Sequence, residues 1–170
     1  MMQALEAGGM CVLTDNIRTS DKDNPRGYYE LEPVKNTKSD PSWVPNAVGK
    51  AVKMVYRLLY NLPKDYEYRV IFMRRNVDEV LASQKIMLER IGQKGANANE
   101  EKLADLFKRD LEKVYRWVDS QDNFSMVSIN YKDMVKSALP QCRRANEFLG
   151  GDLDIDKMAS VVNPSLYRNR

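Results

Sequence analysis

The stretch that decides the fold is Tyr68–Arg90, which reads YRVIFMRRNVDEVLASQKIMLER. Its apolar run, Val70–Met73, is too short for a helix and is bounded by charged residues. Such a run is typical of a strand that is covered on both faces, as in a parallel sheet. Because Arg74 and Arg75 follow directly, the sequence predicts a buried strand whose carboxyl end carries two guanidinium groups.

A helix is expected directly after this strand. Asn76 can act as its N-cap, and Glu79 stands three residues later in the position of a capping box. The pattern of an amphipathic helix then follows, carried by Val77, Val80, Leu81, Gln84, Leu88 and Ile91. Free N–H groups and the helix dipole favour an anion at this N-terminus, and an arginine adds a bidentate fork. Arg75 and Ser83 are therefore candidate phosphate ligands, with surface salt bridges as the alternative role of the arginine.

Length and composition indicate one soluble globular domain, since the 170 residues are 43% hydrophobic and 30% charged. The net charge of +3 is weak and the basic residues are interspersed with acidic ones, so nucleic-acid binding is not supported. Neither a signal peptide nor an apolar run long enough to cross a bilayer is visible. Cys11 and Cys142 form no metal motif and no disulfide framework. We therefore expect a cytoplasmic protein without a membrane partner.

The chain contains no histidine. Histidine-dependent triads and HExxH zinc sites are therefore excluded. A general base, if the chain has one, must be a carboxylate or a less usual group.

Strands and helices alternate along the rest of the chain. Further strands are expected at Met10–Leu13, Lys50–Tyr56 and Phe124–Asn130, and residues 50–75 are expected to form a strand–crossover–strand unit with parallel pairing. Helices are expected at Met1–Ala7, from about Tyr28 to Asp40, at Leu58–Tyr60, Glu100–Ser120 and Ser137–Leu149, and around Asp156–Val161. This alternation predicts an α/β layered fold with a mostly parallel sheet.

Ligands of such sheets bind outside the carboxyl ends of the strands. Arg75 lies at one such end, Lys53 lies within a neighbouring expected strand, and Asp15 follows a third. These three positions are the first places where a site is expected.

The segment Arg75–Ser83 resembles a motif of the bacterial sulfotransferase family. In that family an arginine closes the strand and a serine eight residues later lies on the helix. The pair holds the 3′-phosphate of the donor, 3′-phosphoadenosine 5′-phosphosulfate, and Arg75 and Ser83 match both positions. The family's usual Asp-Pro-Arg after the arginine is Asn76–Asp78 here. Further segments resemble one bacterial subgroup, namely Gln3–Gly9, Asn24–Glu30, Gly49–Lys53 and Glu147–Gly150.

The resemblance implies one sulfotransferase-like domain over residues 1–170, with a P-loop-type three-layer α/β fold. Lys53 matches a strand lysine that faces the transferring sulfuryl group, while the histidine base that often follows two residues later is Val55 here. Because some branches use a glutamate as the base, Glu30 or Glu32 is the candidate. The alternative is that these carboxylates only stabilise a helix N-terminus. The implied acceptor is a small-molecule or carbohydrate-type hydroxyl or amine, and no metal is required.

The family's donor-binding loop, similar to Gly-x-Pro-Arg-Ser-Gly-Thr-Ser, comes directly before the helix that Met1–Ala7 matches. That loop cradles the 5′-phosphosulfate with backbone N–H groups. We therefore expect an N-terminally truncated domain that lacks the first strand and the P-loop. Its intact form would be a sulfotransferase; alternatively, the chain is a non-catalytic remnant or interaction module that pairs its open strand edges with a partner or a second copy. A small kinase ranks last, since no Asp-rich magnesium motif and no lysine-containing P-loop is present.

Overall fold

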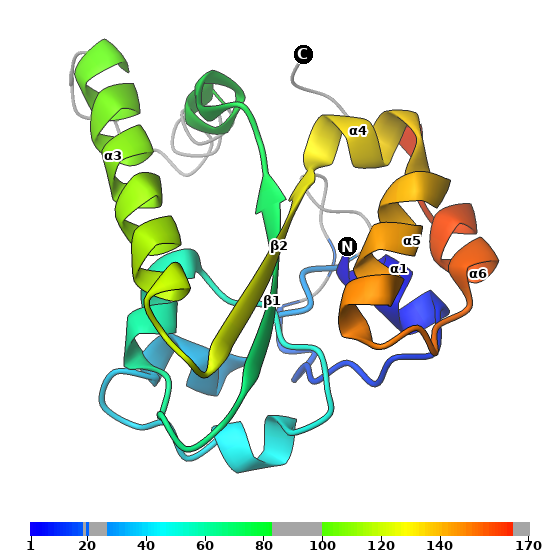
Figure 1. Ribbon diagram of the computed structural model, residues 1–170, viewed down its shortest axis with the longest axis horizontal. Helices are drawn as coiled ribbons and strands as arrows, with labels where there is room; N and C mark the ends of the chain where they lie inside the picture. Colours follow the sequence, from blue (N-terminus) through cyan, green and yellow to red (C-terminus); the bar gives the residue numbers. More distant parts are fainter. Residues whose placement is uncertain (19, 21–26, 83–99, 165–170) are drawn as a thin grey trace.

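The computed structural model describes residues 1–18, 20, 27–82 and 100–164 (Figure 1). Among the predicted features, Ser83, residues 24–26 and the continuation of the helix beyond Ala82 lie outside the described residues.

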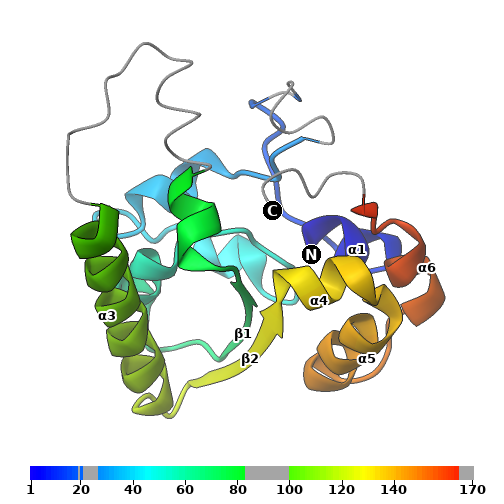
Figure 2. The same cartoon turned by 90° about the horizontal axis from the view of Figure 1, so that it is seen from above.

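A two-stranded parallel sheet stands at the centre of the molecule. β1 (Tyr68–Arg74) pairs with β2 (Phe124–Asn130) in a register that runs from Tyr68 opposite Phe124 to Arg74 opposite Asn130. Helix α3 (Glu100–Asp119) lies on one side of the strands and α5 (Ala138–Leu149) on the other (Figures 1 and 2). The mixed α/β arrangement and both strands were therefore predicted correctly.

The remainder of the expected sheet is reduced to a single parallel bridge between Val12 and Ala51. Leu13 N–H donates to the carbonyl of Ala51 at 2.9 Å, and Ala51 N–H donates to that of Cys11 at 2.8 Å. The predicted strand–crossover–strand unit over residues 50–75 is wrong, because Ala51 pairs with Val12 whereas β1 pairs with β2. The observed sheet is thus smaller than the layered P-loop-type sheet that the resemblance implies.

Short helices complete the chain. The helix expected from Tyr28 to Asp40 is instead the 3-10 helix η1, Glu32–Asn36, with Pro33 in its first turn as predicted. Tyr29 has a φ of +53°, a left-handed conformation that no right-handed helix can include, so the helix starts after it. The other short helices are α1 (Met2–Ala7), η2 (Val44–Ala47), η3 (Tyr56–Asn61), α4 (Tyr131–Lys136) and α6 (Ile155–Ser160).

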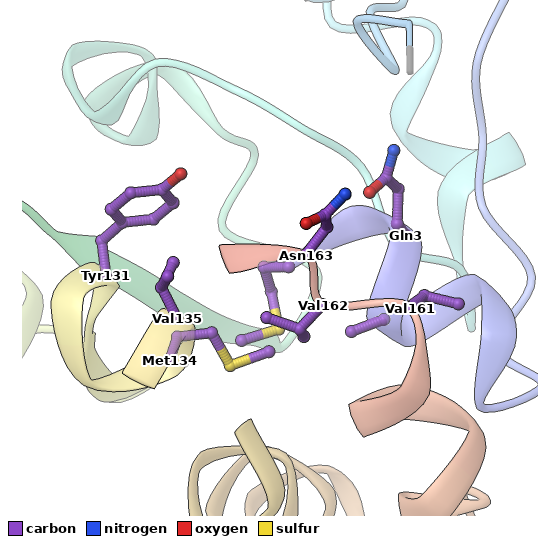
Figure 3. Close-up of a pocket in the computed structure, with 9 residues that line it drawn as sticks. Gln3, Tyr131, Met134, Val135, Val161, Val162 and Asn163 are labelled. Carbon is purple, nitrogen blue, oxygen red and sulfur yellow. The ribbon is translucent and has the colours of Figure 1, made fainter. Parts of the chain in front are cut away.

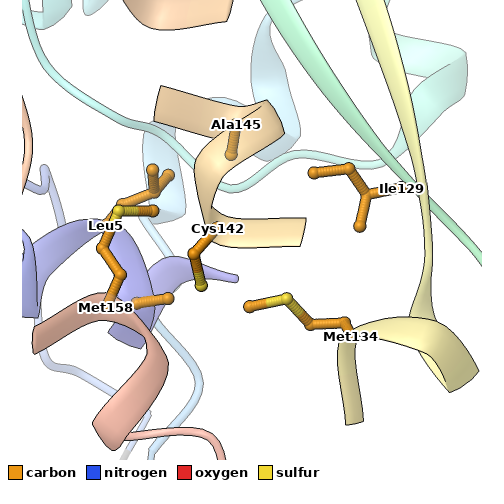
Figure 4. Packing of buried hydrophobic residues seen from close by; sticks show 7 residues of the cluster. Leu5, Ile129, Met134, Cys142, Ala145 and Met158 are labelled. Carbon is orange, nitrogen blue, oxygen red and sulfur yellow. The ribbon is translucent and has the colours of Figure 1, made fainter. Parts of the chain in front are cut away.

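Three apolar clusters form the core, and each joins segments that are distant in the sequence. The largest joins α1, β2, α4, α5 and α6 (Figure 4) through Leu5, Ile129, Met134, Cys142, Ala145 and Met158. The second packs α3 against β1, β2 and η3 through Leu59, Val114 and Val118. The third surrounds Val34, Trp43 and Val44, and Val52 and Met54 pack against it. Lys53 therefore lies between two anchored side chains. Of the helices in the described part of the chain, none combines the length and the apolar character needed to cross a bilayer.

Candidate functional site

Two of the predicted site residues, Glu30 and Lys53, lie next to each other. The Lys53 ammonium is 3.7 Å from Oε1 of Glu30 and donates a hydrogen bond of 2.8 Å to the carbonyl of Tyr28. The same ammonium is 5.7 Å from the centroid of the Tyr28 ring. The folded chain thus brings the predicted base and the predicted charge-stabilising lysine together beside one aromatic side chain.

Two further cations surround the Glu30 carboxylate. Arg18 contacts Oε1 at 3.1 Å, and its guanidinium also stacks 3.4 Å from the centroid of the Tyr28 ring. Lys35 lies 3.9 Å from Oε2 of Glu30 and 2.6 Å from Oε2 of Glu32. We call Arg18, Glu30, Lys35 and Lys53 the Glu30 cluster.

The structure separates the two candidate bases. Glu32 is the first residue of η1 and its carboxylate contacts Lys35 one turn later, so it fits the structural role of a carboxylate at a helix N-terminus. Glu30 precedes Leu31, the N-cap of η1, so it lies outside the helix. Its side chain is only 21% exposed and contacts Lys53. Glu30 is therefore the better placed of the two for chemistry.

The segment before η1 is held in place by hydrogen bonds to residues 14–17. The Thr14 hydroxyl and the Asp15 N–H both donate to the Glu30 carbonyl, at 2.9 and 3.1 Å. The Asp15 carboxylate accepts from the backbone N–H groups of Ile17 and Glu32, and these donors hold the pKa of Asp15 below its ordinary value. Asp15 thus acts as a positioning residue for Glu30.

Lys53 is half-exposed, with 43% of its side chain accessible. Burial lowers the pKa of Lys53, and the Glu30 carboxylate opposes this by favouring the charged form. Val52 and Met54 pack into the third core cluster on either side of it. The ammonium is thus carried on an anchored segment and still reaches solvent.

Arg75 lies at the carboxyl end of β1, as predicted, and is exposed. Its guanidinium is 4.7 Å from the centroid of the Tyr131 ring. The helix after it starts as expected: the Asn76 side chain accepts from Asp78 N–H at 2.9 Å, and the Asn76 carbonyl accepts from Val80 N–H at 3.1 Å. The structure does not test the pairing of Arg75 with Ser83, since the serine is outside the described residues. In the described part of the chain, no salt bridge or hydrogen bond joins Arg75 to the Glu30 cluster.

A small pocket lies beside Tyr131, between α1, α4 and the residues after α6 (Figure 3). Its volume is about 90 Å³, below the several hundred Å³ typical of sites that enclose a nucleotide-sized ligand. Its lining is mostly apolar and includes Met134, Val135, Val161 and Val162. The pocket alone therefore does not provide a donor site.

Sequence reasoning missed Arg18 and the positioning role of Asp15. Both act through contacts with a segment more than ten residues away, and no short motif reports such contacts. Within the described ranges, no group of three His, Cys, Asp or Glu side chains has a metal-binding arrangement.

Comparisons of the chain with protein-family models, with curated proteins and with solved structures find no match.

Proposed function

We propose that this chain is a sulfuryl-transfer domain. Together with a loop that cradles the 5′-phosphosulfate, it would move a sulfuryl group from 3′-phosphoadenosine 5′-phosphosulfate to a hydroxyl or amine of a small-molecule or carbohydrate-type acceptor. The observation that carries the proposal is the contact between Glu30 and Lys53 beside Tyr28, because the family resemblance implies complementary roles for these residues in that reaction.

Each residue has a definite role in the proposed reaction. The acceptor oxygen or nitrogen attacks sulfur, its proton passes to the Glu30 carboxylate, and the bond from sulfur to the phosphate oxygen breaks. The bond electrons leave with adenosine 3′,5′-bisphosphate. Lys53 stabilises the negative charge on the transferring group, which requires its ammonium to turn from Glu30 toward a sulfuryl oxygen. Arg75 and Ser83 would hold the 3′-phosphate of the donor.

Calorimetry with adenosine 3′,5′-bisphosphate tests the binding half of the proposal. We expect no measurable binding to the 170-residue chain, because it contains no loop of the kind that cradles the 5′-phosphosulfate. In a protein that also carries such a loop, Arg75→Ala should weaken binding about 10- to 150-fold, since hydrogen bonds to charged groups contribute roughly 1.5–3 kcal/mol. Arg74→Ala is the matched control, because Arg74 is an exposed arginine at the same strand end. Equal affinity in the wild type and Arg75→Ala would remove Arg75 from the site.

Transfer of labelled sulfate in the same protein tests the chemical half. Lys53→Met should lower the rate by about 10²- to 10³-fold, the loss typical when an enzyme loses one donor that stabilises charge in the transition state. Lys50→Met, which replaces an exposed lysine three residues earlier, should leave the rate unchanged. A Lys53→Met protein with the wild-type rate would contradict the assigned role.

The second candidate function is the interaction module that pairs through open strand edges. The observation that favours it is the small size of the sheet, because a sheet of two parallel strands leaves strand edges available for pairing.

A further inference from the structure

The outer edge of β2 can be identified residue by residue. Tyr68 N–H donates to the carbonyl of Asn123 at 2.8 Å, and Tyr68 stands opposite Phe124 in a parallel register. In a parallel ladder the residues of one strand turn their backbone groups alternately toward and away from the other strand. The backbone groups that face away from β1 are therefore those of Phe124, Met126, Ser128 and Asn130.

Three of these outward groups have a partner within the described residues. Phe124 N–H donates to the carbonyl of Gln121 at 3.3 Å, and the Ser128 carbonyl accepts from Arg144 at 3.3 Å. Asn130 is the N-cap of α4, so its carbonyl accepts the first hydrogen bond of that helix. Neither the N–H nor the carbonyl of Met126 has a hydrogen-bond partner in the described part of the chain. Helices α3 and α5 lie on either side of the strands, and no described helix or strand runs alongside this edge of β2 (Figure 2). The Arg144 side chain of α5 is the described group that reaches it, at the Ser128 carbonyl.

We propose that this edge binds β2 of a second copy of the chain, in antiparallel orientation, with the two-fold axis between the two Val127 residues. In this register Met126 faces Ser128 of the second copy, and Phe124 faces Asn130. Residues that face each other with outward backbone groups exchange both hydrogen bonds in an antiparallel ladder. The two Met126–Ser128 pairs can form both bonds, with Arg144 displaced from the Ser128 carbonyl or sharing it. The two Phe124–Asn130 pairs can form the bond from Asn130 N–H to the Phe124 carbonyl, because Phe124 N–H and the Asn130 carbonyl already have partners within the chain.

The charges at the two ends of β2 support a second copy as the partner. Asp122 precedes the strand and Lys132 follows it; both are exposed, and neither forms a salt bridge within the described residues. The proposed register brings Asp122 of one copy opposite Lys132 of the other, twice in the dimer. A parallel pairing in register would instead align like charges. The edge is thus self-complementary under a two-fold rotation, as an interface between identical subunits requires.

The unpaired backbone groups of the edge favour the same partner. An exposed strand edge tends to recruit another strand, because its free N–H and C=O groups are a template for pairing. The dimer would join two parallel pairs into one continuous sheet. This inference specifies the second candidate function, the interaction module: the outer edge of β2 is the binding edge, the pairing is antiparallel, and the partner is a second copy of the chain. It does not depend on sulfuryl transfer.

Sedimentation velocity over a range of concentrations tests the proposal on the 170-residue chain. We expect a reversible monomer–dimer equilibrium. Met126→Pro should weaken it about 5- to 150-fold, since each dimer loses two hydrogen bonds. The same substitution should leave the β1–β2 ladder intact, because the N–H that it removes faces outward and proline is tolerated there. An unchanged circular dichroism spectrum checks that the variant is folded.

A charge exchange provides the second measurement. Asp122→Lys and Lys132→Asp should each weaken the dimer, and the double variant should restore it because the opposite charges meet again. Asp156→Lys, at an exposed acid on α6, is the matched control and should have no effect. The proposal is overturned if the chain is monomeric at every concentration, or if Met126→Pro dimerises as the wild type does. A double variant that is no better than the single variants would overturn the register. Loss of bisphosphate binding would leave all of these results unchanged.

Discussion

Replacing Thr37 with valine should destabilise the part of the molecule that supports the Glu30 cluster. Thr37 is 1% exposed, and its hydroxyl accepts from the indole N–H of Trp43 at 3.1 Å while donating to the carbonyl of Val34 at 2.6 Å. These residues hold η1 and η2 together in the cluster against which Val52 and Met54 pack. The hydroxyl therefore links the helix that follows Glu30 to the segment that carries Lys53.

The expected loss follows from the two hydrogen bonds. Thr37→Val keeps the shape of the side chain but leaves the buried indole N–H of Trp43 without a partner, which costs about 1–3 kcal/mol. The Val34 carbonyl loses one hydrogen bond, worth about 0.5–1.5 kcal/mol, and keeps the bond from Thr37 N–H. After the gain from the added methyl group, the loss in unfolding free energy should be about 1–4 kcal/mol. Thr37→Ser keeps the hydroxyl and loses one buried methyl group, so it should cost only about 1 kcal/mol.

Urea unfolding followed by circular dichroism measures these differences. The order of stability should be wild type, then Thr37→Ser, then Thr37→Val. A loss of less than about 1 kcal/mol in the valine variant would show that the hydroxyl is not a structural link. Equal losses in the two variants would assign the effect to packing and would refute the reasoning from hydrogen bonds.

Two further predictions concern titratable groups. Burial raises the pKa of Tyr68 to about 12, and its hydroxyl donates to the carbonyl of Pro63 at 2.8 Å. A raised pKa in the folded state contributes stability that is complete below the unfolded value of about 10 and is lost as the pH rises toward about 12. Urea midpoints should therefore fall over this range, and less so in Tyr68→Phe; an equal fall in both proteins would contradict this. Iodoacetamide should label exposed Cys11 in the native protein and spare fully buried Cys142, whose thiol pKa is raised by burial, until urea is added. Labelling is measured by mass spectrometry, and equal labelling of Cys11 and Cys142 in the native protein would contradict this prediction.

The elements with strong local patterns could be predicted from the sequence. The apolar run that became β1, the strand β2 and the amphipathic pattern of α3 were all found within a residue or two. Lys50–Tyr56 looked equally like a strand, but its side chains at Val52 and Met54 are used for packing on the third core cluster. Periodicity reports burial, and it does not distinguish burial in a sheet from burial of an irregular segment.

Helix α4 was missed for a different reason. No turn separates it from β2, because Asn130 is at once the last residue of the strand and the N-cap, with its side chain accepting from Lys132 N–H at 2.8 Å. The contact between Glu30 and Lys53 also could not be predicted from the spacing of these residues in the sequence. Both residues were selected from a family resemblance, and the third partner, Arg18, emerged only from the fold.

The charges around Glu30 limit how a donor could be recognised. Arg18, Lys35 and Lys53 are matched by three carboxylates, those of Asp15, Glu30 and Glu32, so the surroundings of Glu30 are close to neutral. A neutral cluster exerts little attraction on a trianionic or tetra-anionic nucleotide at a distance. In the proposed function, affinity for the donor must therefore come from phosphate ligands such as Arg75, while the Glu30 cluster acts on the transferring group. Substitutions of Arg75 and Lys53 should therefore affect different measurements. Arg75→Ala should weaken bisphosphate binding, whereas Lys53→Met should lower the transfer rate with binding retained. If Lys53→Met reduces both in proportion, the lysine contacts the nucleotide in the ground state and this division of roles is wrong.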